Sequence, residues 1–385
     1  MDKWIKVKIS DLGQVVGGAT PSTKVDEYYN GDIAWITPKD LSNFKGRYIS
    51  RGERNITNAG KDSCSTQLLP KNTVLFSSRA PIGYVAIAEN EMCTNQGFKS
   101  VIPNEDIDYL FLYYLLKYNK ATIEAMGSGT TFKEVSGSTM RNIEVMIPES
   151  KDIQKKIAAI LDSIDSKIEN NQKINDNLQH QAMALYASMF LDNPALETTA
   201  GTLKDIADIT MGQSPSGSSY NEDGNGEVFY QGRAEFGYRF PTRRLFTTEP
   251  KRMAEAGDVL LSVRAPVGDL NVAYERCCIG RGLGAIHGRN GYQSFVLYTM
   301  FALRPQLDVY NGEGTVFGSI NRNALNDMPI DIPSEDAIAA FESVVRPMDD
   351  VVRTNYEENC RLQELRESLL PRFMSGEIDV SDIDF

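Results

Sequence analysis

Hydrophobic and polar positions follow two different patterns along this chain, and these patterns divide it into four segments. In residues 1–148 and 201–333, short apolar runs such as Val74–Phe76 lie between Gly, Pro, Asn and Ser turns, which indicates β-strands. In residues 149–200 and 334–385, apolar side chains instead recur every three or four positions, which indicates long helices. The sequence therefore predicts two strand-rich globular domains, each followed by a helical spacer.

The first globular domain combines strands with a helix. Further strands are expected at Asp32–Thr37, Tyr84–Ala88 and Lys99–Ile102, and a helix is expected at Tyr109–Ala125. The last strands of the two domains are expected at Ile143–Ile147 and Met328–Ile332. We predict an α/β mixed (α+β) fold for each domain.

The two helical segments, Glu149–Phe190 and Ser334–Met374, each carry a one-sided apolar stripe close to heptad spacing. We expect the two helices to pack on each other as an antiparallel pair, with Asn171 and Asn359 on the seam to fix the register. The apolar residues expected on this seam include Ile157, Ile164, Ile174, Leu178, Val345, Val352 and Leu362. All of these except Ile174, together with Asn171, also serve as candidate docking positions. The alternative is that each helix covers its own globular domain.

An internal repeat with an offset of 185 residues relates the two halves of the chain. LFSSRAPIG at Leu75–Gly83 recurs as LLSVRAPVG, and the same offset relates NQGF at 95–98 to GRGL at 280–283 and GSGTTF at 127–132 to GEGTVF at 312–317. The opening segments KISDLGQVVGGATPS and LKDIADITMGQSPS are also similar. Each half is therefore a copy of one structural unit.

The net charge of −12 argues against a nucleic-acid partner if it is taken as an average. The charge is unevenly distributed, because residues 1–148 carry +1, 149–200 carry −3, 201–333 carry −2 and 334–385 carry −8. Basic loops are therefore compatible with the two near-neutral domains, whereas the acidic helices suit a protein partner.

Sequence features indicate a cytoplasmic protein without a membrane span. The N-terminus MDKWIKVKIS lacks an apolar signal region, and the densest apolar run, Tyr109–Leu116, is far shorter than the roughly 20 residues that a spanning helix needs. The five cysteines form no CxxC pair, which fits a reducing compartment.

Known catalytic signatures are absent from the sequence. No GxxxxGK[ST] phosphate loop, NPPY-type or DPPY-type methylation tetrapeptide or acidic-lysine nuclease motif occurs. His180 and His287 are the two histidines, and they lie in unrelated segments. We therefore expect no catalytic residue, no cofactor and no metal.

The repeated loops carry residues suited to DNA contact. Arg79 and Arg264 sit in a Ser-x-Arg-Ala-Pro turn, where a guanidinium can bind a phosphate or a guanine edge. An arginine that holds its own loop through an internal ion pair would give the same pattern. Other candidates in the repeated loops are Gln96, Arg281, Ser128, Thr130, Thr131 and Thr315, although a plain turn before the final strand explains the last four equally well.

Residues that differ between the two copies are the better candidates for reading bases, because shared residues suit phosphate positioning. The divergent stretches are Thr37–Gln67 and Tyr230–Lys251. Their candidate DNA-binding residues are Lys39, Lys45, Arg47, Arg51 and Arg54 in the first and Tyr230, Gln231, Arg233, Arg239, Arg243 and Arg244 in the second. A solvated charged loop would have a similar composition.

In this order the motifs resemble those of the specificity subunits of type I restriction-modification systems. The resemblance rests on GDIAWITPKDL at 31–41, SSRAPIGYVAI, GSGTTFKEVSGSTMRNIEVMIP at 127–148, DIQKKIAAILDSID and the C-terminal LLPRFMSGEIDV. The second half departs from it, since VFYQGRAEF at 228–236 replaces the WITPKDL-like string. Transfer of residue roles to that half is correspondingly weaker.

The resemblance implies two target-recognition domains in inverted orientation, each of which reads one half of an asymmetric, bipartite double-stranded DNA target. Two helices that the family keeps would set the gap. The implied partners are two modification subunits, which bind S-adenosylmethionine and methylate adenine, and two ATP-dependent restriction subunits.

Two other readings fit parts of the sequence. An acidic protein that mimics DNA would have the pI of about 4.9, although its acidic residues should spread over the whole body. A duplicated carbohydrate-binding or protein-binding module with a helical stalk would have the same repeat. DNA binding in the presence of the modification subunit distinguishes these readings.

Overall fold

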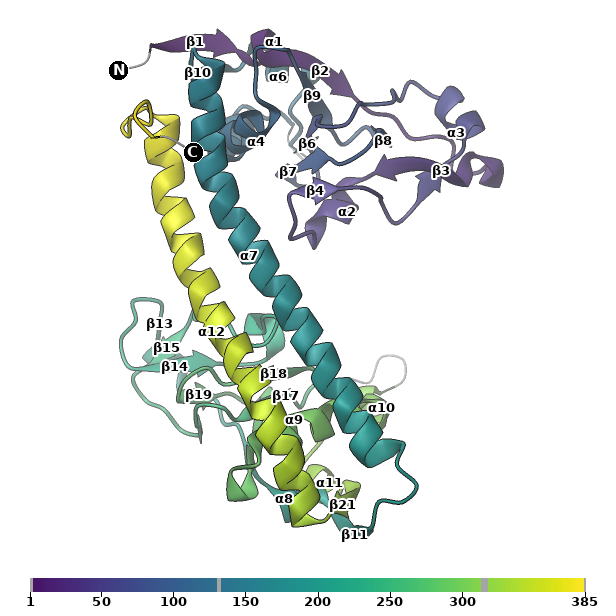
Figure 1. Cartoon of the computed structure of the whole chain (residues 1–385), viewed down its shortest axis with the longest axis vertical. Coiled ribbons are helices and arrows are strands. Elements are labelled where there is room, and N and C mark those ends of the chain that lie inside the picture. The colour runs from purple at the N-terminus through teal and green to yellow at the C-terminus, as the bar shows by residue number, and fades with distance from the viewer. Residues whose placement is uncertain (1–2, 130–132, 313–317, 384–385) are drawn as a thin grey trace. The chain divides into compact units, whose positions relative to one another are not determined.

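A computed structural model describes residues 3–129, 133–312 and 318–383 of the chain. The chain forms two compact units, of which unit 1 comprises Met1–Asn171 and Glu357–Phe385, and unit 2 comprises Gln172–Tyr356. Each unit holds one globular domain and parts of the two long helices, α7 (Lys151–Tyr186) and α12 (Glu335–Met374) (Figure 1). A short π-helix, Ala187–Leu191, continues α7.

Unit 1 contains three sheets. The largest has the strand order β2-β9-β6-β7-β4, the second has the order β5-β3-β8, and β1 pairs with β10. Their bounds are β1 Trp4–Lys8, β2 Gly13–Gly17, β3 Tyr29–Ile36, β4 Tyr48–Ile49, β5 Asn55–Ile56, β6 Val74–Ser78, β7 Ile82–Ala88, β8 Met92–Thr94, β9 Lys99–Pro103 and β10 Glu144–Pro148. The helices are α1 Ile9–Leu12, α2 Pro38–Ser42, α3 Asn58–Asp62, α4 Tyr109–Tyr118, α5 Lys120–Ala125 and α6 Gly137–Asn142.

Unit 2 repeats this arrangement. Its sheets have the strand orders β12-β20-β17-β18, β13-β15-β14-β19-β16 and β11-β21. Their bounds are β11 Thr198–Thr202, β12 Ala207–Met211, β13 Tyr220–Asn221, β14 Glu227–Tyr230, β15 Phe246–Thr247, β16 Met253–Ala254, β17 Val259–Ser262, β18 Leu270–Val272, β19 Cys277–Ile279, β20 Leu283–Gly288 and β21 Pro329–Pro333. The helices are α8 Leu203–Ile206, α9 Gln293–Ala302, α10 Arg304–Asp308 and α11 Arg322–Asn326.

The pairing of strands confirms the mixed α/β fold and the duplication. β3 runs parallel to β8 in unit 1, and β14 runs parallel to β19 in unit 2, while β6 and β17 pair antiparallel with β9 and β20. The predicted strands are present, and their ends lie within three residues of the expected ones. The expected helix Tyr109–Ala125 is divided into α4 and α5 at Asn119, whose side-chain amide donates to the Leu115 carbonyl over 2.8 Å and ends the first helix.

One apolar helix covers the sheet in each unit. In unit 1, Phe111 and Leu112 of α4 are fully buried against sheet residues such as Phe76 and Val101. In unit 2, Phe295 and Val296 of α9 occupy the matching core. Burying continuous apolar runs of this kind contributes the main favourable free energy of folding. No helix among residues 3–129, 133–312 and 318–383 is long and apolar enough to cross a membrane.

The two long helices contact each other within each unit, as predicted. In unit 1, the side chain of Asn171 donates to Asn359 over 2.9 Å, and Arg366 contacts Asp165, which shows that α7 and α12 run antiparallel there. In unit 2, Asn355 donates to Asn175 over 2.8 Å. The alternative arrangement also holds in part, because seam positions toward the helix ends pack into the globular cores.

The predicted seam residues differ in how deeply they are buried. Ile157 lies in the core of unit 1 and Val345 in that of unit 2, and Ile164, Asn171 and Val352 are also buried. Leu178 and Leu362 are partly buried. The prediction for Ile174 is wrong, since 38% of this residue is exposed and Asn175 takes the inward position beside it.

Candidate nucleic-acid interface

The Ser-x-Arg-Ala-Pro turn has the same hydrogen bonds in both units. In unit 1, the hydroxyl of Ser77 donates to the Pro81 carbonyl over 2.8 Å and accepts from the Tyr84 amide over 2.8 Å. In unit 2, Ser262 makes the matching bonds to Pro266 and Asp269 over 2.8 and 2.9 Å. A buried serine therefore fixes the turn that carries Arg79 or Arg264.

The turn requires glycine at its far end. Gly83 and Gly268 have φ angles of 95° and 99°, a backbone region that residues with a Cβ rarely adopt. The repeat of this glycine in both copies follows from that geometry.

Two other repeated segments meet the turn. The Ser78 amide donates to the Gly97 carbonyl over 2.7 Å, and the Val135 amide donates to the Ser78 carbonyl over 3.0 Å. In unit 2, the amides of Val263 and Ile320 make the equivalent bonds to Gly282 and Val263 over 2.9 and 3.1 Å. In each unit, the Ser-x-Arg-Ala-Pro turn therefore lies beside the motif at 95–98 or 280–283 and beside Val135 or Ile320, which follow the glycine-rich motif, and we call these residues the loop cluster.

The loop that follows β2 in unit 1 and β12 in unit 2 completes the loop cluster. The sequence analysis did not assign this loop a role. The Ala19 amide donates to the Thr94 carbonyl over 3.1 Å, and the Thr20 hydroxyl contacts the exposed amide of Gln96. In unit 2, Arg281 donates through its backbone amide to the Ser214 hydroxyl over 3.2 Å. The similarity of the two opening segments was the signal that could have identified this loop.

Arg79 and Arg264 have different surroundings. Arg79 is 3.5 Å from the Glu134 carboxylate, which also lies 3.3 Å from Lys99. In unit 1 the arginine therefore forms the internal ion pair that was the alternative to DNA contact. The offset of 185 residues puts Ser319 and Gly284 at the positions of Glu134 and Lys99. Arg264 is exposed and forms no ion pair with another described residue. Unit 2 therefore presents a more available arginine than unit 1.

The prediction that Arg47 contacts DNA is wrong, because this side chain is only 6% exposed. Its guanidinium pairs with Asp162 and Glu169 of α7 and donates to the Ser166 hydroxyl over 2.9 Å. A buried arginine with two carboxylate partners cannot leave them without exposing unpaired charge. Arg47 therefore attaches its loop to the long helix.

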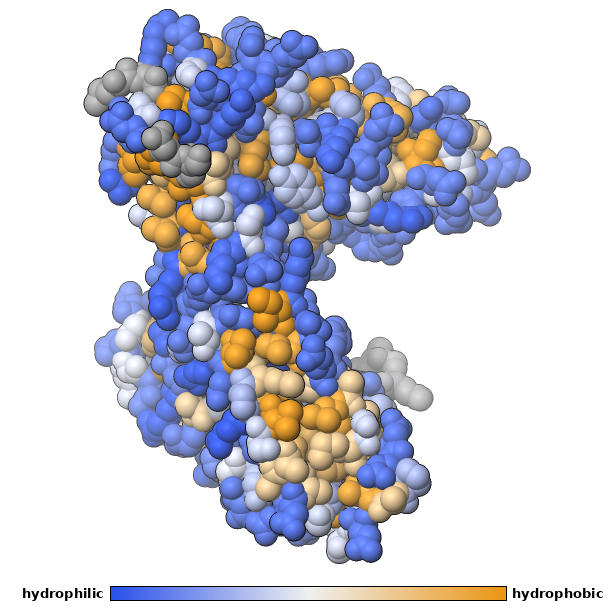
Figure 2. Space-filling view, in the orientation of Figure 1, coloured by the Kyte–Doolittle hydropathy of each residue, from blue (hydrophilic) through white to orange (hydrophobic). Residues whose placement is uncertain are grey.

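The other basic residues of this stretch remain accessible. Lys39 pairs with Glu53 over 2.7 Å while 77% of its side chain is exposed, and Lys45 is also exposed. Arg51 lies against the side-chain amide of Asn55, and Arg54 lies 4.0 Å from the centre of the Tyr29 ring. Hydrophilic residues cover much of this part of unit 1 in Figure 2.

Two predicted DNA contacts of unit 2 are also buried. Tyr230 is 1% exposed in the core, and burial raises the pKa of its hydroxyl. Arg239 is 5% exposed and pairs with Asp349 of α12 over 3.4 Å. Tyr230 ends β14 and Arg239 lies in a loop, and the fold turns both side chains inward, so these two predictions are wrong.

The remaining candidates of this stretch lie at the surface. Gln231 is exposed, and its carbonyl accepts from the Gly282 amide of the loop cluster over 3.1 Å. Three arginines are half exposed and engaged with acidic side chains, namely Arg233 with Asp269, Arg243 with Glu275, and Arg244 with Glu235 over 2.7 Å. The pairs of Arg233 and Arg243 can exchange a carboxylate for a phosphate at small cost. Glu235 is buried, so Arg244 would leave an unpaired buried carboxylate if it moved to a phosphate.

The glycine-rich loops are described only in part. Ser128 is exposed, and its amide and carbonyl pair with those of Glu134 over 3.0 and 2.9 Å. Thr130, Thr131 and Thr315 lie outside the described residues. Within the described ranges, no group of three or more His, Cys, Asp or Glu side chains could hold a metal ion. The loop cluster offers cationic and amide donors, which suit recognition of an anionic polymer.

Comparisons with known proteins agree with this organisation. A profile of the type I restriction modification DNA specificity domain matches residues 1–180. The type I restriction enzyme MjaIX specificity subunit of Methanocaldococcus jannaschii is 30% identical over 418 residues, which cover 99% of this chain and 94% of that protein. The putative type I restriction enzyme MjaX specificity subunit of the same organism is 28% identical and covers 80% of this chain and 78% of its own length.

A solved structure shares the fold. The S subunit of a type I restriction-modification system from M. genitalium superposes with a TM-score of 0.61 at 18% identity, over 97% of this chain and 96% of that chain. The similarity to the first relative extends over nearly the full length of both proteins. This chain therefore belongs to the family of type I restriction enzyme specificity subunits.

Proposed function

We propose that this chain is the DNA-specificity subunit of a type I restriction-modification complex, in which each half reads one part of a bipartite, asymmetric DNA target. The observation that supports this most is the loop cluster, which has the same backbone hydrogen bonds in both units but different side chains around them. A shared scaffold suits phosphate positioning, and divergent side chains suit the reading of different bases.

The proposed recognition domains are residues 1–148 and 201–333, and the proposed spacers are 149–200 and 334–385. Phosphate contacts are assigned to the shared positions Arg79, Arg264, Gln96, Arg281 and Ser128. Base contacts are assigned to the accessible divergent residues Lys39, Lys45, Arg51, Arg54, Gln231, Arg233, Arg243 and Arg244.

The chain performs no catalytic step in this proposal and acts in the cytoplasm as an adaptor. Its helices dock two modification subunits and two ATP-dependent restriction subunits, which supply the chemistry. The net charge of −8 on residues 334–385 supports a protein rather than a DNA partner for this segment.

Methylome sequencing of cells that express the chain with its modification subunit tests the proposal directly. The expected result is methylation at a two-part, non-palindromic motif with a fixed gap. A single continuous motif would contradict the assignment of one half-site to each half of the chain, and the absence of any motif would contradict the DNA-reading function.

The contribution of the loop cluster is tested in the assembled complex with Arg264→Ala. We expect weaker DNA binding and a salt slope that is shallower by about one, because roughly one phosphate contact is lost. Arg276→Ala is the matched control. This half-exposed arginine precedes β19, at the end of the strand away from the loop cluster, and pairs with Glu227. If Arg264→Ala leaves the salt dependence of DNA binding unchanged, Arg264 does not contact a phosphate.

A further inference from the structure

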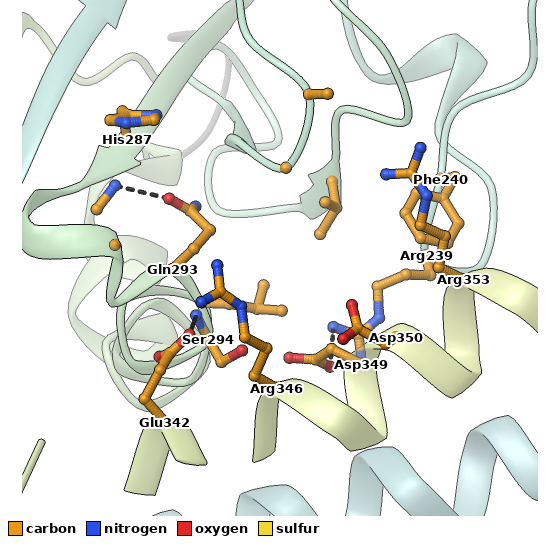
Figure 3. A pocket seen from close by; sticks show the side chains of 16 residues that line it. Arg239, Phe240, His287, Gln293, Ser294, Glu342, Arg346, Asp349, Asp350 and Arg353 are labelled. Atoms are coloured by element: carbon orange, nitrogen blue, oxygen red, sulfur yellow. Dashed lines mark hydrogen bonds and ion pairs between the residues drawn. The ribbon is translucent and has the colours of Figure 1, made fainter. Parts of the chain in front are cut away.

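Unit 2 contains a cavity of about 250 Å³ that is lined by three arginines from different segments. Arg346 and Arg353 extend from α12, and Arg239 reaches the same space from the globular part of the unit (Figure 3). Ends of β20 and α9 form part of the remaining wall, at residues such as His287 and Gln293. The proposed DNA-reading function gives this cavity no role.

The internal repeat shows what occupies the equivalent place in unit 1. The Ile87 amide donates to the Arg47 carbonyl over 2.8 Å, and the Val272 amide donates to the Arg239 carbonyl over 2.8 Å. Ile87 and Val272 are related by the offset of 185 residues. Arg47 and Arg239 therefore occupy the same position in the fold of the two units.

The long helices also correspond, with an offset of 184 residues. This offset turns the Asn171–Asn359 pair of unit 1 into the Asn355–Asn175 pair of unit 2. It likewise turns the Tyr114–Asp165 hydrogen bond into the Tyr298–Asp349 hydrogen bond.

The two carboxylates that hold Arg47 are replaced by cations in unit 2. Under the offset of 184 residues, Asp162 and Glu169 of α7 correspond to Arg346 and Arg353 of α12. One arginine and two carboxylates in unit 1 thus become three arginines in unit 2. Like charges that line one cavity repel each other, and a bound anion offsets this repulsion.

A buried donor in unit 2 is left without the acceptor that its counterpart has. Nε of Arg47 donates to Glu169 over 3.0 Å. Nε of Arg239, in a side chain that is 5% exposed, has no hydrogen-bond partner among the described residues. Leaving such a charged donor unsatisfied costs free energy, so the site lacks one anionic oxygen.

The acidic residues of the cavity are already engaged or exposed. Glu342 accepts from the backbone amides of Ser294 and Phe295 at the start of α9, over 3.2 and 2.9 Å. Asp349 accepts from the Tyr298 hydroxyl over 3.0 Å and pairs with Arg239 at another nitrogen. Asp350 is exposed.

The cations of the cavity differ in their engagement. Arg346 is exposed and forms no ion pair in the described part of the chain. Arg353 donates to the Tyr274 carbonyl over 3.0 Å and stacks on that ring. The lining therefore places three arginines beside three carboxylates, of which Glu342 and Asp349 already accept hydrogen bonds.

We propose that this cavity binds a small oxyanion, with a carboxylate or phosphate group that accepts from Nε of Arg239 and lies between Arg346 and Arg353. The bound oxygen replaces the one that Glu169 supplies in unit 1. This site is independent of the loop cluster and does not rest on the proposed DNA-reading function.

Thermal unfolding of the full chain with inorganic phosphate or acetate tests the proposal. A ligand that binds the folded state alone raises the Tm with its concentration. We expect at least one of the two anions to raise the Tm more than sodium chloride at the same ionic strength. If neither anion exceeds sodium chloride, the proposal is overturned; which of them is stronger distinguishes a phosphate from a carboxylate ligand.

Two variants restore the charges of unit 1. Arg346→Asp changes an exposed residue to the type found at 162, and Arg353→Glu changes the next cation to the type found at 169. Each should weaken anion binding by about tenfold or more, because a charge-assisted contact is replaced by repulsion. Arg346→Asp keeps the test valid if Arg353→Glu fails to fold, since Arg353 has structural contacts.

Arg322→Asp is the matched control, because it makes the same charge change at an exposed residue of unit 2 outside the cavity. It should leave anion binding unchanged. Retention of the full anion effect in Arg346→Asp would overturn the assignment. Displacement of the anion by duplex DNA would also overturn it, because the cavity would then belong to the DNA interface.

Discussion

The side-chain amide of Asn171 donates to Asn359 over 2.9 Å and to Glu358 over 2.7 Å, inside the contact between α7 and α12 of unit 1. Asn171 is fully buried and Asn359 is 8% exposed. A polar pair inside an apolar seam fixes the register of two helices, because any shift leaves buried amides unpaired.

We predict that Asn171→Ala lowers the free energy of unfolding by about 1–3 kcal/mol, since it leaves the Asn359 oxygen without its donor. The double variant Asn171→Ala with Asn359→Ala should be less destabilised than the sum of the single variants. Urea denaturation in a double-mutant cycle measures this coupling. Additive effects would show that the hydrogen bond makes no energetic contribution.

Arg47→Ala is predicted to destabilise unit 1 by about 3 kcal/mol, because it removes the buried partner of Asp162 and Glu169. Lys45→Ala, two residues away and exposed, is the control and should change stability by less than about 0.5 kcal/mol. Chemical denaturation of both variants checks this. A stable Arg47→Ala protein with weakened DNA binding would favour the DNA contact that the structure argues against.

Glu134→Gln should strengthen DNA binding and steepen its salt dependence. The carboxylate of Glu134 lies 3.5 Å from Arg79 and 3.3 Å from Lys99, so its neutralisation makes two cations available to phosphate. Fluorescence anisotropy of the assembled complex at several salt concentrations measures the slope. Glu53→Gln, which relieves only Lys39, should have a smaller effect. An unchanged slope in Glu134→Gln would exclude this ion pair from the DNA interface.

Cysteine labelling reports the burial of β19 in unit 2. Burial raises the pKa of the Cys277 thiol to about 12, so almost no thiolate is present at pH 8 in the folded protein. We expect iodoacetamide to modify the partly exposed Cys64 and Cys360 well before Cys277, and mass spectrometry of the native protein to show this order. Equal labelling in urea is the control. Early modification of Cys277 would show that this part of unit 2 opens readily.

Shortening the spacers tests whether they set the gap of the DNA target. Removal of about seven residues, or two helical turns, from both α7 and α12 should shift the gap or abolish methylation. Methylome sequencing of the shortened form gives the result. Methylation at the original gap would refute the role of the helices as a spacer.

Local patterns in the sequence were enough to predict the duplication, the strand-rich domains and the two long helices. These features depend on local periodicity and on similarity at one offset, which a single chain displays directly. The pairing of Asn171 with Asn359 also followed from heptad spacing. The second pair, Asn175 with Asn355, was missed, although the repeat could have indicated it.

The availability of the basic residues to DNA depends on contacts between segments that are distant in the sequence. Arg47 and Arg54 lie in one polar stretch, yet Arg47 is buried against carboxylates 115 and 122 positions along the chain. An arginine has the same local sequence pattern whether its partner is water, a phosphate or a distant carboxylate. Folding brings those partners together, and for this reason the burial of Arg47, Arg239 and Tyr230 depended on contacts that local sequence does not contain.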